Sequence, residues 1–144
     1  MQKITIIAIG NLREDYLKKA YAEYAKRISR FAKLEIIEIK ETNSLKEGEE
    51  VLKKLSLFSK AFFCALAIKG REHSSESFAE KIIKDKSHLV FIIGGSEGLS
   101  ENVLASCDNI SFGKITFPHQ LMRVILVEQI YRGFKILNGE KYHK

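Results

Sequence analysis

Proline is almost absent from this sequence: Pro118 is the only one among 144 residues. The chain contains no Pro-rich or Ser-rich linker, no internal repeat and no low-complexity segment. A chain of this length can bury roughly 68–70% of its unfolded surface, which is enough for a core. We therefore expect one domain over residues 1–144 and exclude a disordered chain.

Cysteine is also scarce. Cys64 and Cys107 lie far apart, each in or beside an apolar stretch, and neither has a partner at the two-residue spacing of a zinc or redox motif. We expect buried, reduced thiols, with redox chemistry as the alternative. We expect no metal site, because no ligand pairing occurs among the four histidines, His73, His88, His119 and His143.

Long hydrophobic runs are missing too. The N-terminal run at residues 4–9 is broken by Thr5, is too short for a signal-peptide core and soon turns polar, at Asn11. No other segment approaches the roughly 18 apolar residues of a membrane span. We expect a cytoplasmic protein that does not contact membranes.

Acidic residues are outnumbered. The 24 Lys and Arg residues against 18 Asp and Glu give a formal net charge of +6 and a sequence pI near 9.3. This balance favours polyanionic partners, although many basic proteins are simply soluble. Near His143 we expect either a nucleic-acid contact or a frayed tail, because cations crowd this end, namely Arg132, Lys135, Lys141 and Lys144.

Apolar runs of strand length alternate with stretches that carry helical spacing or helix-start signals. The runs are residues 3–9, 34–39, 62–68, 89–93 and 110–112, and the helical stretches are 11–30, 51–55, 77–83, 101–106 and 118–134. This order predicts an α/β fold with a mainly parallel sheet, right-handed crossovers and helices on both faces.

Four helix starts have local signals. Capping-box spacing occurs at Asn11 to Glu14 and at Ser77 to Glu80. Ser100 is a good N-cap residue, and Pro118 suits the first helical position, where its missing N–H has no intrahelical partner. The helix after Pro118 is apolar around its circumference, which predicts burial on two sides. Its second side packs either within the monomer or on a second copy, and we expect a twofold homodimer.

A glycine loop, Gly94-Gly95-Ser96-Glu97-Gly98, follows the strand at 89–93. Its glycines let the backbone approach a ligand closely, and with residues 115–119 it suggests a pocket walled by main chain. The loop lacks the GxGxxG pattern of dinucleotide sites, and Ile115 after Gly113-Lys114 rules out a Walker loop. A plain structural turn is the alternative.

The last third of the chain carries a more specific resemblance. Its segments are Ile93 to Ser100, Ile115 to Val124, Glu128 to Arg132 and the ending Tyr142-His143-Lys144. In this order and spacing they resemble the SPOUT methyltransferases and, more narrowly, the ribosomal RNA large-subunit methyltransferase H family. The resemblance covers essentially the full length, including the strands near residues 6–10 and 35–39.

This resemblance implies a deep C-terminal trefoil knot, an S-adenosylmethionine pocket inside it and an obligate homodimer. It also implies methylation of N3 of a pseudouridine in 23S ribosomal RNA, free or within the ribosome. A non-catalytic RNA-binding dimer on the same scaffold is the alternative. The implied cofactor contacts are Leu66, Gly94, Gly95, Gly113, Lys114, Ile115, Thr116, Phe117 and Pro118.

Two departures from the family pattern stand out. Ser96 replaces a proline that is usual in the loop, so the turn loses some rigidity. Lys144 replaces a usual arginine, so the charge is kept and the bidentate fork is lost. The expected RNA contacts are Arg123, Tyr142, His143 and Lys144, with Arg123 facing either a phosphate or the partner subunit.

For methyl transfer from a sulfonium, the protein has to align the nucleophile with the methyl group and exclude water. The reaction requires neither a metal nor a residue that forms a covalent intermediate. The imide nitrogen must lose a proton, so a base of near-neutral pKa helps. We favour His143, because a mobile tail can close over a nucleotide, and keep His119 and Glu97 as candidates. The alternatives are a helix-start residue for His119, a disordered end for His143, and a cap or an amino-group contact for Glu97.

Overall fold

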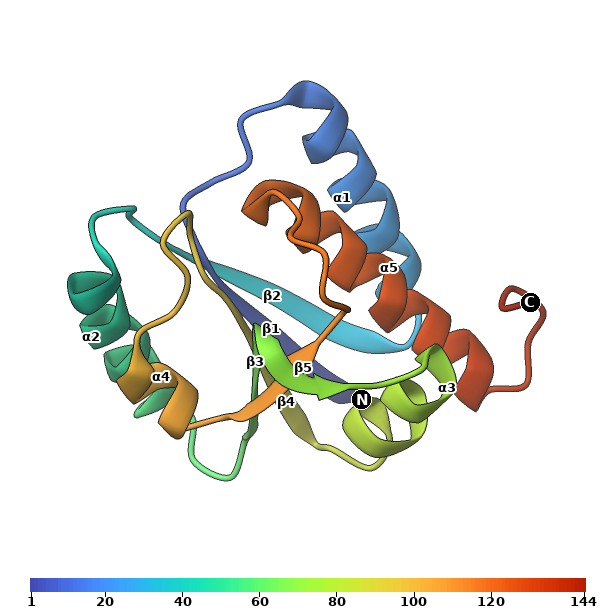
Figure 1. The fold of residues 1–144 in the computed structure, drawn as a ribbon. Helices are drawn as coiled ribbons and strands as arrows, with labels where there is room; N and C mark the ends of the chain where they lie inside the picture. The colour runs from blue at the N-terminus through green and yellow to red at the C-terminus, as the bar shows by residue number, and fades with distance from the viewer.

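The computed structural model describes the whole chain, residues 1–144. Its centre is a five-stranded sheet of order β2-β1-β4-β3-β5, in which every neighbouring pair is parallel (Figure 1). The strands are β1 (Gln2–Ile9), β2 (Ala32–Ile39), β3 (Phe62–Glu72), β4 (His88–Ile93) and β5 (Asp108–Ser111). The predicted parallel α/β architecture is therefore confirmed.

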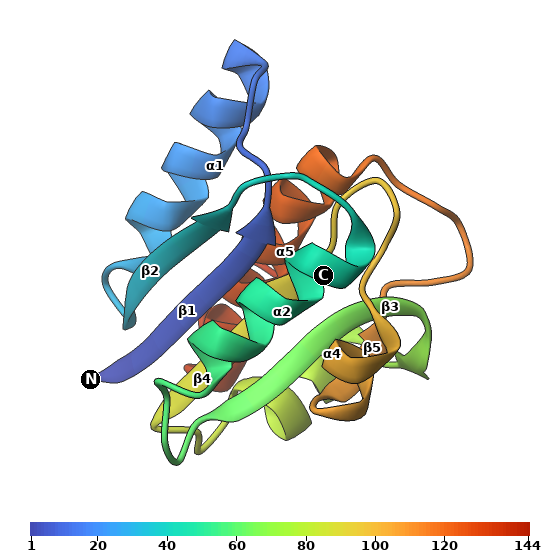
Figure 2. The ribbon, with the colours of Figure 1, turned by 90° about the vertical axis from the view of Figure 1, so that its left-hand side faces the viewer.

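Helices cover both faces of this sheet. One face carries α1 (Asp15–Ile28), α3 (Ser75–Ser77), the π-helix η1 (Phe78–Ile83) and α5 (His119–Leu137), and the other carries α2 (Ser44–Leu55) and α4 (Glu101–Ala105) (Figures 1 and 2). No helix has the length and apolarity that crossing a membrane would require.

The alternation of side chains along β1 divides the core into two layers. Ile4 and Ile6 pack with residues of α1, η1 and α5, whereas Ile7 and Ile9 pack with residues of α2 and α4. All four side chains are almost completely buried. Burial on both faces explains why the central strands read as nearly continuous apolar runs.

The sequence predicted the positions of the strands more accurately than the first residues of the helices. The capping box expected at Asn11 is wrong, because α1 begins at Asp15 after Glu14, whose side chain makes no capping bond. The start expected at Ser77 is also wrong: Ser74 Oγ accepts the Ser77 N–H at 3.0 Å and begins the helix earlier. In both places another residue provides the transition from extended to helical backbone.

The other two starts agree more closely. Ser100 is the N-cap of α4 as predicted, and its hydroxyl accepts the Val103 N–H at 3.4 Å. Pro118 stands one residue earlier in the helix than predicted, as the N-cap of α5 with ψ of 137°, so His119 is the first helical residue.

A close backbone contact bends the end of β3 around β5. Leu66 and Arg71 both have Ile110 as their register partner, so residues 67–70 leave the ladder between them. Gly70 lies where β3 crosses the backbone of β5. A Cβ on Gly70 would lie 2.6 Å from the carbonyl carbon of Asn109 and 2.7 Å from backbone atoms of Ile110. Only glycine fits this crossing, because backbone atoms cannot move aside cheaply.

We expect Gly70→Ala to lower the free energy of unfolding by about 1–3 kcal/mol, the usual effect of overpacking. Urea denaturation at equilibrium measures this loss. The exposed neighbour Lys69 provides the control, because Lys69→Ala should stay within about 0.5 kcal/mol of the parent. Equal midpoints for the two variants would contradict the contact.

Candidate functional site

A cleft of about 850 Å³ lies at the carboxyl ends of β3, β4 and β5. Three segments provide most of its wall: the end of β3 at residues 66–69, the glycine loop with its flanks at 93–99, and the connection from β5 into α5 at 111–119. Ligands of open parallel sheets bind at this edge, because the loops there converge while the sheet supports them. We call this space the cleft.

The cleft brings together nearly all residues that the sequence singled out for a cofactor. Of those nine, Lys114 is the only one outside its lining; His119 and Glu97 also line it. Ser96 and Gly98 also line it and belong to the glycine loop from which the sequence predicted a pocket. Ile93, Leu99 and Met122 lie in the segments that carry the family resemblance. The sequence did not single out the remaining lining residues, namely Ala67, Ile68, Lys69, Leu104, Ser111 and Phe112.

The glycine loop is a β-turn closed by a hydrogen bond. The Gly98 N–H donates to the Gly95 carbonyl at 3.0 Å, and Gly98 has a φ of +76°. A Cβ on Gly94 would lie 2.9 Å from the Gly98 carbonyl carbon, so that position also needs glycine. Ser96 is the second residue of this turn, where φ is negative and proline is common.

Two glycines leave open space where a side chain would stand. Gly98 and Gly113 both have positive φ, and a Cβ built on either meets no atom within 4 Å. Both residues line the cleft. Any other residue at these positions would add a side chain beside the cleft and would strain the backbone.

The ionisable side chains that line the cleft are Lys69, Glu97 and His119. The carboxylate of Glu97 accepts the Ser44 N–H at 3.3 Å, at the N-terminus of α2. This contact corresponds to the helix-capping alternative for Glu97, and it ties the glycine loop to α2. The His119 side chain belongs to the first residue of α5 and is half-buried.

The C-terminal tail packs against its own chain rather than over the cleft. Tyr142 Oη donates to Glu128 at 2.8 Å, and burial, together with this bond, raises the pKa of the Tyr142 hydroxyl. His143 Nε2 lies 2.8 Å from Glu76, and its Nδ1 lies 3.1 Å from Arg132. The tail residues Tyr142, His143 and Lys144 are not part of the cleft lining.

Arg123 is buried instead of facing a substrate. Only 2% of the residue is exposed, its Nη1 donates to Glu38, and its Nη2 donates to the Gly10 carbonyl at 3.0 Å. The guanidinium therefore joins α5 to the ends of β1 and β2. This intramolecular role argues against the predicted contact of Arg123 with RNA or a partner subunit.

Both cysteines are free. Cys64 is fully buried, and burial raises the pKa of its thiol. Cys107 is only half-buried, although burial still raises its thiol pKa to about 11. Protonated thiols at neutral pH are poor nucleophiles, which fits the predicted passive role. No three His, Cys, Asp or Glu side chains in the structure are grouped so that they could hold a metal ion.

Comparison with known proteins assigns the family. A family model described as "Predicted SPOUT methyltransferase" matches residues 2–143. This chain belongs to the SPOUT methyltransferases. It is also 49% identical to a protein of Carboxydothermus hydrogenoformans and 45% identical to one of Enterococcus faecalis, with 99% of each chain covered in both cases. A protein of Limosilactobacillus reuteri is 49% identical, with 98% of this chain and 99% of that protein covered.

All three relatives are named ribosomal RNA large subunit methyltransferase H, so the narrower family predicted from the sequence is confirmed. A solved structure from Haemophilus influenzae Rd KW20, described as "a probable methylase family protein", superposes with a TM-score of 0.60. That match covers 99% of this chain and 70% of the other at 12% identity, and it bears on the fold alone.

The turn geometry predicts that Ser96→Pro stabilises this SPOUT protein. Proline fixes φ near the value that this turn position requires, so the free energy of unfolding should exceed that of Ser96→Ala by about 0.4–1 kcal/mol. The alanine variant is the matched control, since both substitutions remove the hydroxyl that donates to Glu41 at 3.3 Å. Thermal denaturation of the two variants measures the difference. A proline variant that melts below the alanine variant would contradict the assigned turn.

Proposed function

We propose that this protein transfers a methyl group from S-adenosylmethionine to N3 of a pseudouridine in 23S ribosomal RNA. The observation that carries the proposal is the match to methyltransferase H proteins at 45–49% identity over nearly the whole chain. The formal net charge of +6 suits an RNA substrate. Action in the cytoplasm, on 23S RNA or the assembled ribosome, belongs to the same proposal.

The residues of the cleft fit the methyl donor. Its volume of about 850 Å³ lies within the usual range for cofactor sites. Gly98 and Gly113 carry no side chain, and the space beside each is open, which leaves room for a ligand at the wall. The donor supplies an activated methyl group on a sulfonium. The proposed contacts are Leu66, Gly94, Gly95, Gly113, Ile115, Thr116, Phe117 and Pro118, with Lys114 adjoining the cleft.

A homodimer and a C-terminal trefoil knot are also part of the proposal. One side of α5 carries Leu121 and Ile136, which share it by their spacing. These side chains are only half-buried in the single chain and lie outside both core layers. A second copy that packs on this face would bury them, as the sequence predicted for a helix apolar on all sides.

The reaction needs one proton transfer. A base of this chain would accept the N3 proton, which frees the N3 electron pair to bond the methyl carbon. A donor held by the cleft residues would supply that methyl group and would keep the sulfur electron pair, so that the step balances. His119 and Glu97 line the cleft, whereas His143 serves as the base only if the tail leaves Glu76. The tail residues Tyr142, His143 and Lys144 remain the proposed RNA contacts.

Ile115 offers a direct test of the donor site. Its side chain lines the cleft and is 74% exposed, so Ile115→Ala should leave stability nearly unchanged. If the donor covers this side chain, the loss of about 1–2 kcal/mol of apolar burial weakens S-adenosylmethionine binding roughly 5–30-fold. Titration calorimetry measures the affinity. The matched control is Leu57→Ala, because Leu57 is 72% exposed and lies outside the cleft; equal effects of both variants would argue against the site.

The base can be identified from pH–rate profiles on ribosomes that lack the modification. A base can accept the proton only in its deprotonated form, so the parent rate should rise with pH as the base loses its own proton. The variants are His119→Gln, Glu97→Gln and His143→Gln. In the variant that removes the base, the rate should no longer rise with pH, and kcat should fall by a factor of about 10²–10⁴. RNA binding without any methyl transfer by the parent protein would favour the non-catalytic RNA-binding dimer.

A further inference from the structure

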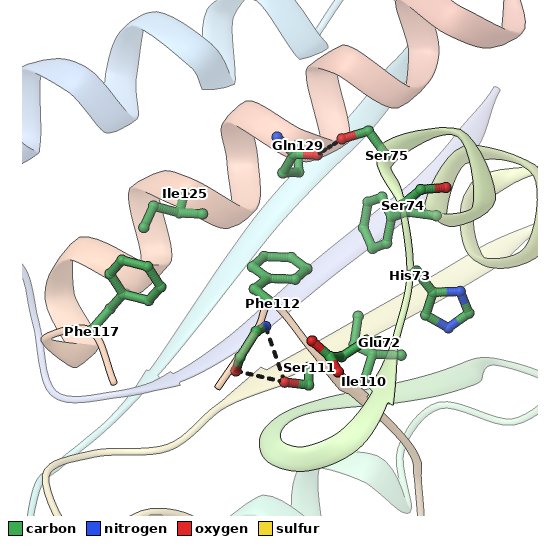
Figure 3. Close-up of a pocket in the computed structure, with 12 residues that line it drawn as sticks. Glu72, His73, Ser74, Ser75, Ile110, Ser111, Phe112, Phe117, Ile125 and Gln129 are labelled. Atoms are coloured by element: carbon green, nitrogen blue, oxygen red, sulfur yellow. Dashed lines mark hydrogen bonds between the residues drawn. The ribbon is translucent and has the colours of Figure 1, made fainter. Parts of the chain in front are cut away.

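A second hollow lies beside the cleft, between α5 and the chain that follows β3 (Figure 3). Its volume is about 290 Å³, and we call it the α5 hollow. Residues 111–113 and Phe117 line both spaces. The two spaces therefore share part of their lining and adjoin there. The volume of the hollow falls just below the usual range of ligand pockets, about 300–1,000 Å³, so it has room for a group much smaller than a whole cofactor.

The apolar part of the hollow matches a flat ring. Phe112, Phe117 and Ile125 line it, and Phe112 is held edge-on against Phe78 with ring centroids 5.9 Å apart. Unstacked RNA bases are commonly received on aromatic side chains, because each base has a flat π-face. Ser111 stiffens the shared wall: its hydroxyl donates to the Gly113 carbonyl at 2.9 Å and accepts the Gly113 N–H at 3.1 Å.

The polar part of the hollow contains an ordered pair of side chains. Ser75 Oγ donates to Gln129 Oε1 at 2.7 Å, and Gln129 Nε2 donates to Glu128 at 2.7 Å. These bonds leave one amide N–H of Gln129 as a donor and the lone pairs of the Ser75 hydroxyl as acceptors. Figure 3 shows this pair on one side of Phe112 and Ser111 on the opposite side.

Pseudouridine has an edge that complements this pair. Its ribose is attached to carbon, so N1 keeps a hydrogen next to the C2 carbonyl, whereas N1 of uridine carries the ribose. We infer that the α5 hollow receives the acceptor base, with Ser75 accepting the N1–H and Gln129 donating to the C2 carbonyl. N3 is then left free of this pair, on the side where the hollow adjoins the cleft. This inference rests on the proposed function and assigns to Ser75 and Gln129 the selection of pseudouridine over uridine.

The test compares ribosomal subunits that carry either pseudouridine or uridine at the target position. Single-turnover rates, with enzyme in excess, give the selectivity ratio for the parent, Ser75→Ala and Ser75→Thr. Loss of the hydroxyl should lower the ratio by at least about tenfold, because a site that hydrogen-bonds an N–H rejects the analogue without it. Threonine keeps the hydroxyl and should preserve most of the ratio. Gln129→Leu should also lower the overall rate, since the C2 carbonyl then loses its donor.

Three results would overturn the inference. The parent enzyme could methylate both substrates at the same rate, Ser75→Ala could lower the rates on both substrates by the same factor, or Ser75→Ala could leave both rates unchanged. An equal loss accompanied by a weaker dimer in sedimentation would assign the hollow to a second copy instead. Failure of the proposed function has a different signature, because the parent protein would then bind no donor by calorimetry or would methylate neither substrate.

Discussion

The crossing of β3 over β5 at Gly70 is the constraint on which both cavities depend. Before the crossing, residues 66–69 line the cleft, and after it, residues 72–75 line the α5 hollow. The same register partner, Ile110, stands on each side of the irregularity. If the two backbones were further apart, β3 would no longer hold the walls of both spaces in place. Gly70, which lines neither space, thus fixes their relative position.

The helices add rigidity around this crossing. The buried Arg123 joins α5 to the Gly10 carbonyl and to Glu38, so the helix is anchored at the strand ends beside the cleft. At its other end, α5 holds the tail, because Glu128 accepts from both Tyr142 and Arg132. The Arg132–Glu128 contact joins two residues one helical turn apart. Charged groups in this protein therefore position elements as much as they attract a polyanion.

Sequence patterns identified the sheet and the cleft but not the α5 hollow. A strand that is covered on both faces is apolar along its whole length, and this signal is local. The strands near residues 3–9 and 89–93 were therefore located well. The cleft was found because its glycines cluster and because the family motif marks the connection into α5. By contrast, Ser75 and Gln129 are distant in sequence and carry no motif, so only the fold reveals the pair.

Errors in the sequence interpretation have a common physical origin. Helix starts at Asp15 and Ser75 depend on the path of the preceding chain, which a four-residue capping pattern does not contain. The contacts of Arg123 with Glu38 and of His143 with Glu76 were equally invisible, because each pair joins different elements. The role of His143 as a base stays a prediction.

The wall common to the cleft and the α5 hollow has a thermodynamic consequence. If a ligand in one space shifts residues 111–113, it changes the free energy of binding in the other, and linkage makes that change equal in both directions. If the donor changes the affinity for the base by some factor, the base changes the affinity for the donor by the same factor. In the proposed reaction the donor loses its positive charge, so any part of this coupling that depends on the charge disappears when the methyl group is transferred.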